Sequence, residues 1–576
     1  MTHSGAGSVV SGRSRSPEDS GAAVAGAPAP PSAQVLSPSA ARSAPHPKGA
    51  GSKEEGCTRR GSVSADGRLI GSVAAEGHVE AAGDLLSALV IAQQGNLLDV
   101  LEVGQAGSEV RAVLKPGVLR AMRLVTVLQS WVAGYLLAQM NVTVFVLLNE
   151  QACAAGHSCR GWHVCLFGAF FLGMSTGGAL AGLVQAASTH RFTVLISTAL
   201  MLLTALSTVV STDRVAVTWE RFLCGLCTGC GVLCLSVYVS RCATFTRSRV
   251  FGALYQIAHI TGVLTAYLLG LGYLGPNTLT SLGDRSDTSP WSGSTWSRST
   301  LACVWIRVSV MPAVVGLMVA LRLFYSTFRF ETPHDYVRRA DYANAKAMLR
   351  CLYEVEEAEH MDTLLCVIKL QTDQQSTSHT GSCSRYLRNA LHAFFQQASG
   401  FNALLAASTA LFYPLVHTRT HGLRLAILLT LAMGAGGWSV TLITGVLLDK
   451  WMSKKPIILI AVALQVVVAS ILSWLHWGNN PDHVIVTGCL WVLFICLHCM
   501  GYGTVTKIFD PSFVKPFQQD TVNPVWPGVS SSLRWFIACC WTVLAFTVPH
   551  LGWFFIAVAV STLTTWVGVL IDLDHL

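Results

Sequence analysis

Charged residues are scarce in this sequence. Asp, Glu, Lys and Arg together make up 12% of its 576 residues, whereas a soluble globular chain carries about 25%. Hydrophobic residues make up 52%, and the mean hydropathy is +0.50. So few charges cannot cover a surface of this size that faces water, and we therefore predict that most of the surface faces lipid.

Catalytic and cofactor motifs are also absent. The sequence contains no P-loop, no H-E-x-x-H and no nucleophile elbow, and its His–Cys spacings do not resemble a zinc site. Most of the 18 cysteines lie in apolar runs, where cysteine acts as a small hydrophobic residue. The formal charge of +8 comes from basic residues in short loops between those runs, which membrane topology explains without nucleic acid. We expect neither an enzyme nor a bound metal or cofactor.

The chain does contain many apolar runs of the length that crosses a membrane, about 20 residues. Six precede and six follow one polar segment, which predicts an all-α membrane protein of two six-helix bundles. The expected regions are a disordered cytoplasmic tail (1–118), an N-terminal bundle (119–326), a cytoplasmic helical linker domain (327–385) and a C-terminal bundle (386–576). The expected spans lie near 121–149, 161–185, 192–211, 215–240, 250–273, 301–325, 387–415, 423–448, 455–475, 483–507, 527–549 and 551–572.

Basic residues set the expected orientation. If the N-terminal tail is cytoplasmic, the inner loops hold most of the Lys and Arg, including Arg247, Arg249, Lys454 and Lys455, as the positive-inside rule requires. Both termini are then cytoplasmic in a multi-pass protein. No address motif is evident, and the plasma membrane is the expected location. The expected partners are the lipid bilayer and cytosolic proteins that bind the tail.

Glycines recur in the second and fourth spans. Gly173 and Gly177 lie in the second span, and Gly225 and Gly229 lie in the fourth. Small residues at this spacing let membrane helices approach closely, so we assign these glycines mainly a structural role.

Uncharged amides inside the spans are the best indication of function. Gln396, Gln397 and Asn402 fall within the run FFQQASGFNALLAASTALF, and Gln256 lies alone in the fifth span. Each amide offers donors and an acceptor, which a hydroxyl-rich solute needs, and polar residues in membrane spans tend to mark solute paths. The alternative is hydrogen bonding between helices. It suits an isolated glutamine better than it suits three amides within seven residues.

Several segments resemble the sugar porter family of the major facilitator superfamily, which includes the facilitative glucose transporters. The similar segments are ERFLCGLCTGCGVLCLSVYVSR, FFQQASGFNALLAASTALF, FRFETPHDYVRRADYANAKAMLR and LLDKWMSKKPIIL. The Q-Q-x-S-G-x-N element of the second is the most specific. The resemblance implies two rocking bundles with a sugar site between them near mid-membrane, and hexose transport by alternating access.

The resemblance also assigns roles to single residues. The implied sugar-binding amides are Gln256, Gln396, Gln397 and Asn402. Tyr502 stands where the family has a tryptophan of span ten. Trp535 is the implied match to a tryptophan of span eleven, and Trp541 competes for that place. Arg221 matches an arginine of span four that has a structural and gating role.

The chain departs from the family pattern within the spans. Leu136 stands where proton-coupled members keep a carboxylate, which favours facilitated diffusion. Gly437 replaces an asparagine that contacts sugar, and Ala406 and Ala407 replace a tyrosine pair of the outer gate.

The inner gate departs as well. Arg241 and Lys507 stand where the family has glutamates, so the usual inner charge network cannot form. We expect a rewired network that uses Asp449, Asp510 or Glu331.

These departures leave three functions open. The first is a facilitative hexose transporter. The second is a non-transporting sugar sensor whose N-terminal tail is its signalling surface. The third is a carrier of another polyhydroxyl solute, such as a polyol or a nucleoside. The sequence does not name the sugar.

Overall fold

The computed structural model describes most of the chain after residue 112. The described residues are 113–141, 160–210, 214–242, 245–273, 298–328, 331–354, 361–369 except 363 and 367, 382–416, 422–450, 454–478, 483–505 and 525–571. The expected N-terminal tail therefore lies almost wholly outside the described residues. Lys507 and Asp510 also lie outside them, as does the side chain of Asp449.

Twelve helical segments in the described residues are long and apolar enough to cross a membrane, which confirms the predicted arrangement of six and six. The first six are α3 (Pro116–Ala138), α5 (Arg160–Ala187), α6 (His190–Val210), α7 (Arg214–Cys242), α8 (Phe245–Tyr273) and α10 (Arg298–Thr327). Span seven consists of α14 (Ser382–Gln397) and α15 (Phe401–Val416), and span ten of α18 (Val484–His498) and the π-helix η2 (Cys499–Gly503). The others are α16 (Gly422–Lys450), α17 (Lys454–Gly478), α21 (Val525–Thr547) and α22 (Leu551–Ile571).

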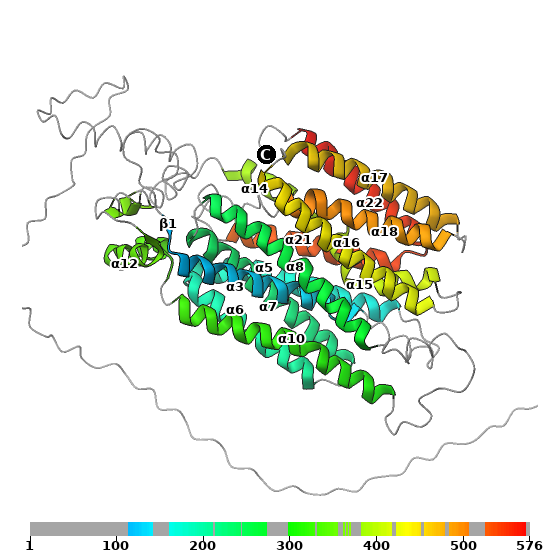
Figure 1. The fold of residues 1–576 in the computed structure, drawn as a ribbon, viewed down its shortest axis with the longest axis horizontal. Coiled ribbons are helices and arrows are strands. Elements are labelled where there is room, and N and C mark those ends of the chain that lie inside the picture. Colours follow the sequence, from blue (N-terminus) through cyan, green and yellow to red (C-terminus); the bar gives the residue numbers. More distant parts are fainter. Residues whose placement is uncertain are drawn as a thin grey trace, which may run out of the picture. The chain divides into compact units, whose positions relative to one another are not determined.

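Contacts between α5 and α21, and between α8 and α16, join the two halves (Figure 1). Within the first half, α5 packs along α7 and α3 packs along α8. The predicted glycines lie in the contact of α5 with α7. A Cβ atom on Gly173 would stand 2.0 Å from the Phe222 carbonyl oxygen, and one on Gly225 would stand 2.1 Å from that of Phe170. These glycines therefore have the predicted structural role of allowing close approach.

The linker domain is tied to the segment that precedes the first span. Helices α11 (Pro333–Arg338) and α12 (Tyr342–Leu352) lead into β2 (Tyr353–Glu354), which pairs antiparallel with β1 (Val113–Leu114). The Leu114 side chain is buried in one cluster with Leu349 and Leu352. Residues 113–115 thus pack with the linker domain, and α3 begins directly after them. We call the end of the bundle that carries α11 and α12 the linker end, and the opposite end the far end.

Candidate functional site

Span seven is broken in the middle, and the predicted amides lie on both sides of the break. Gln396 and Gln397 end α14, and Asn402 lies in the first turn of α15. Gly400 between them has a φ of +64°, a left-handed conformation that glycine adopts without steric cost. The freed carbonyl of Ala398 accepts a hydrogen bond of 2.5 Å from Ser561 Oγ on α22. Discontinuous helices of this kind build solute sites in many transporters.

The break brings two of the three amides into contact. Asn402 Nδ2 donates to Gln397 Oε1 at 3.0 Å, and all three amides are buried. Gln396 makes no hydrogen bond to another described residue. Gln256 on α8 is buried too, and no hydrogen bond among the described residues joins it to the span-seven amides. The structure therefore joins Gln397 and Asn402 directly, beside Gln396, and shows no hydrogen bond from Gln256 to these described residues.

Residues of span ten contact α14 and the break. The Tyr502 hydroxyl in η2 lies 3.3 Å from His392 Nδ1 on α14. One turn earlier, His498 Nδ1 lies 2.9 Å from Ser399 Oγ, inside the break. The His498 ring also stacks on Phe401 with a centroid distance of 4.1 Å. Sequence reasoning missed His498, although a histidine within an apolar span is itself a lead.

The two tryptophans of span eleven occupy different surroundings. Trp535 is buried and stacks on Phe171 of α5 with ring centroids 6.2 Å apart, so it faces the first half of the protein. Trp541 lies edge-on against Phe554 at 5.6 Å, inside the second half. A side chain that contacts both halves suits the role predicted for Trp535.

Arg221 is buried in the first half, as a structural arginine would be. Its Nη1 donates to the Leu136 carbonyl oxygen at 2.8 Å, and its guanidinium lies 4.3 Å from the centre of the Phe170 ring. Arg221 therefore ties span four to spans one and two.

A second irregularity in span seven lies toward the far end. Ala407 has non-helical angles (φ −124°, ψ 16°), which open the helical hydrogen bond between the Leu405 carbonyl and the Thr409 amide. Asn141, just beyond α3, takes both freed groups. Its Nδ2 donates to Leu405 O at 3.3 Å, and its Oδ1 accepts from Thr409 N at 3.1 Å. A side chain from the first half thereby hydrogen-bonds to backbone groups within a helix of the second half.

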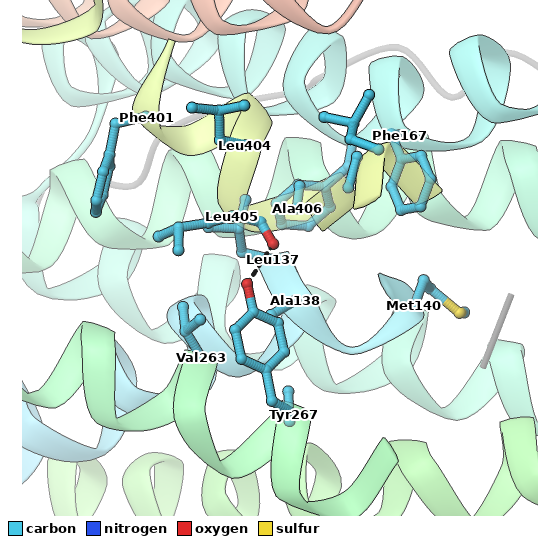
Figure 2. Close-up of a cluster of buried hydrophobic side chains, with 14 of the residues drawn as sticks. Leu137, Ala138, Met140, Phe167, Val263, Tyr267, Phe401, Leu404, Leu405 and Ala406 are labelled. Atoms are coloured by element: carbon cyan, nitrogen blue, oxygen red, sulfur yellow. Dashed lines mark hydrogen bonds between the residues drawn. The ribbon is translucent and has the colours of Figure 1, made fainter. Parts of the chain in front are cut away.

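Two further contacts strengthen this far-end link. Asn141 Nδ2 also donates to Ser408 Oγ at 2.6 Å, and the Tyr267 hydroxyl of α8 donates to Leu405 O (Figure 2). Ala406 and Ala407 stand here in place of the expected tyrosine pair. Asn141 and Tyr267, which sequence reasoning did not single out, make the polar contacts between the halves instead.

Replacing Asn141 with alanine is expected to loosen the far-end link. Buried groups left without a partner cost about 1–3 kcal/mol, so amide exchange at Leu405–Thr409 should quicken by roughly 5- to 150-fold. Hydrogen-exchange mass spectrometry of that segment measures the effect. Gln139→Ala is the matched control, because Gln139 bonds to Ser309 Oγ at 3.2 Å within the first half. Equal exchange in both variants would contradict the assignment.

At the linker end, charges gather around one buried acid, Asp335 of α11. His190 Nδ1 lies 2.9 Å from its Oδ1, Arg241 Nη1 lies 3.9 Å from the same atom, and Thr332 Oγ1 donates to its Oδ2 at 2.8 Å. Burial acts to raise the pKa of Asp335, but the His190 contact and the Arg241 charge outweigh it and hold that pKa well below its usual value. The acid that faces Arg241 is thus Asp335, which the sequence analysis did not name.

Of the acids that were named, Glu331 does join this region. It accepts a hydrogen bond of 2.7 Å from Thr189 Oγ1 and one of 3.2 Å from the Arg191 amide, at the start of α6. The pattern Thr332-x-x-Asp335 is a helix-capping signature that marked Asp335 in the sequence. The described members of the cluster belong to the first half and the linker domain, so it fastens the linker domain to that half.

Comparisons with known proteins agree on one class. The profile of a family described as "Sugar (and other) transporter" matches residues 122–516. Hexose transporter 1 of Toxoplasma gondii is 26% identical over 446 residues, which cover 73% of each chain. Hexose transporter 1 of Plasmodium falciparum is 22% identical over 404 residues, 66% of this chain and 75% of that one.

Solved structures with the same fold include the xylose transporter XylE from E. coli. In its partially occluded inward-open conformation it superposes with a TM-score of 0.60 and 16% sequence identity, over 79% of this chain and 97% of XylE. The fold is that of the major facilitator superfamily.

Proposed function

We propose, from the premise that this chain belongs to the sugar (and other) transporter family, that it carries a hexose-like sugar across a membrane by facilitated diffusion. The two six-helix halves would rock about one central site and open it to each side in turn.

The observation that carries this proposal is the amide cluster at the break of span seven. Gln396, Gln397 and Asn402 are buried and uncharged, and the amide group of Gln396 has no partner among the described residues. The Gln396 amide is therefore free to bind a solute. Hydroxyl groups of a neutral solute would pair with it without bringing a charge into the membrane.

Two further points support the kind of sugar and the kind of transport. The similar proteins of Toxoplasma gondii and Plasmodium falciparum are hexose transporters. Leu136 occupies the position in span one where proton-coupled members keep a carboxylate, so that position carries no proton. Facilitated diffusion needs no such group.

The far-end link supports alternation between two states. Asn141 and Tyr267 join the halves there through Leu405, Ser408 and Thr409. With the basic loops and the linker domain in the cytoplasm, as the positive-inside rule favours, the far end is extracellular and the link closes that side. Both termini would then be cytoplasmic, and the plasma membrane is the location we propose.

Uptake by reconstituted protein tests the proposal. Liposomes that contain the full chain should take up radiolabelled hexose with saturation. Gln396→Ala and Asn402→Ala should each weaken the apparent sugar affinity by about 1–3 kcal/mol, the cost of a buried hydroxyl left unpaired. The double variant should abolish saturable uptake. Gln465→Ala is the matched control, because Gln465 is a buried amide that belongs to α17 and not to span seven.

The outcomes separate the open functions. Saturable uptake that the double variant loses supports a transporter. Hexose binding without flux would instead identify a sensor. If no hexose binds or crosses, a polyol or nucleoside becomes the solute to test.

A further inference from the structure

Two irregular helices meet at the contact between His498 and Ser399. Ser399 is the middle residue of the span-seven break, Ala398–Gly400. His498 is the last α-helical residue of span ten before the π-helix Cys499–Gly503 begins. Their side chains lie 2.9 Å apart and both are buried. Polar contacts in a dry interior are strong and specific, so this one fixes how the two irregular segments sit against each other.

The position of Ser399 makes the contact relevant to the amides. Ser399 lies between Gln397 and Asn402, the two side chains that bond to each other across the break. His498 also stacks on Phe401, the residue directly before Asn402. One histidine ring thus holds the chain at two points between the paired amides. A shift of the ring would change the direction in which those amides point.

His498 connects span ten directly to the break, whereas the neighbouring contacts come from other helices or reach other residues. Ala398 is held from α22 through Ser561, and Gly400 donates to the Gln397 carbonyl within span seven. Tyr502 bonds to His392, which lies in α14 before the amides. Among the described residues, span ten reaches the segment between residues 398 and 401 through the hydrogen bond of His498 with Ser399.

From these contacts we infer that His498 is a positioning residue of the solute site, which acts on the amides through Ser399 and Phe401. The inference rests on the proposed function, since it concerns the geometry of the same site. It predicts that sugar affinity depends on the hydrogen bond between His498 Nδ1 and Ser399 Oγ, which a substitution at either residue removes.

The test compares four single variants and one double variant, Ser399→Ala with His498→Phe, in the uptake assay. Ser399→Ala removes the hydroxyl and keeps the ring, and His498→Phe keeps a ring and removes Nδ1. His498→Asn places an amide near the position of Nδ1 and should retain part of the contact. Ser473→Ala is the matched control, because Ser473 is a buried serine of α17 that donates to Gly552 O at 3.0 Å.

Loss of one neutral hydrogen bond should raise KM for hexose by roughly two- to tenfold in Ser399→Ala and in His498→Phe, with maximal rate changed less. The double variant should be no worse than the poorer single one, because both remove the same contact. His498→Asn should fall between His498→Phe and the wild type. Unchanged KM in both single variants, or effects that multiply in the double variant, would overturn the inference.

Hydrogen exchange without sugar gives a second readout that separates this inference from the proposed function. Amides 398–402 should exchange faster in Ser399→Ala and in His498→Phe than in the wild type and in Ser473→Ala. If the wild type transports no hexose, the proposed function fails, and this comparison alone decides whether His498 positions the break. Equal exchange in all four proteins would show that it does not.

Discussion

Gly225→Ala is expected to lower the melting temperature of the protein strongly. A Cβ atom at residue 225 would lie 2.1 Å from the carbonyl oxygen of Phe170 and 3.1 Å from the amide nitrogen of Met174. Both are backbone atoms of α5, so no side chain can move aside and the two helices must separate. Overpacking of this kind costs about 1–3 kcal/mol, and occasionally more, and the rigid backbone places this site at the upper end.

Gly168→Ala in α5 is the matched control. The nearest atom to a Cβ there is Cys539 Sγ at 3.8 Å, an ordinary van der Waals distance. Alanine also favours a helix over glycine by about 1 kcal/mol, so this variant should melt at or above the wild-type temperature. Thermal melting in detergent with size-exclusion chromatography measures both. If Gly225→Ala melts like Gly168→Ala, spans two and four do not approach as closely as their glycines require.

The glycine contact illustrates what the sequence predicts well. Twelve spans and the close approach of spans two and four follow from hydropathy and from small residues at helical spacing. Each is local, because residues a few positions apart determine it. The burial of Gln396, Gln397 and Asn402 on both sides of Gly400 belongs to the same class. The break in span seven does not, because the three amides were expected in one continuous helix near 387–415, and the structure divides it at Ala398–Gly400.

The missed residues are those whose roles depend on a distant partner. Asn141 matters because Ala407 opens a backbone hydrogen bond on another helix, and nothing near Asn141 in the sequence indicates that opening. His498 matters because Ser399 lies opposite it. Spacing within one helix predicts which face a side chain occupies, but it does not predict what that face meets.

The inner charges show the same limit. Arg241 in place of a glutamate indicated that its partner had changed, and three acids were named from their position near the membrane. Asp335 was not named, because it lies outside the spans and nothing near it in the sequence indicates that it faces His190 and Arg241. In the structure the Thr332 side chain caps α11 and donates to the Asp335 carboxylate, which also faces His190 and Arg241.

Asp335→Asn is expected to release the linker domain from the first half. The substitution leaves the Arg241 guanidinium without its buried counter-charge and weakens the contacts of His190 and Thr332. Removing one partner of a buried ion pair costs about 3–5 kcal/mol. Faster hydrogen exchange across α11 and α12, with a lower melting temperature, would report the release.

Asp362→Asn provides the control for charge alone. Asp362 forms an ion pair of 2.6 Å with Lys346, but its side chain is 61% exposed. Surface pairs contribute about 0–1 kcal/mol, so this variant should stay close to the wild type. If the two aspartate variants lose equal stability, the buried cluster does not hold the linker domain.

The pH dependence of the Asp335→Asn effect distinguishes loss of the carboxylate charge from a change in the packing of α11. The pKa of Asp335 is lowered in the folded protein, so its stabilisation is complete above the unfolded value of about 3.9. It declines as the pH falls below that value and is fully lost below the lower, folded value. The gap in stability between wild type and variant should therefore stay constant from about pH 5 to 8 and narrow below about pH 4. A gap that persists unchanged in acid would mean that asparagine disturbs the packing of α11 and that the carboxylate charge contributes little to holding it.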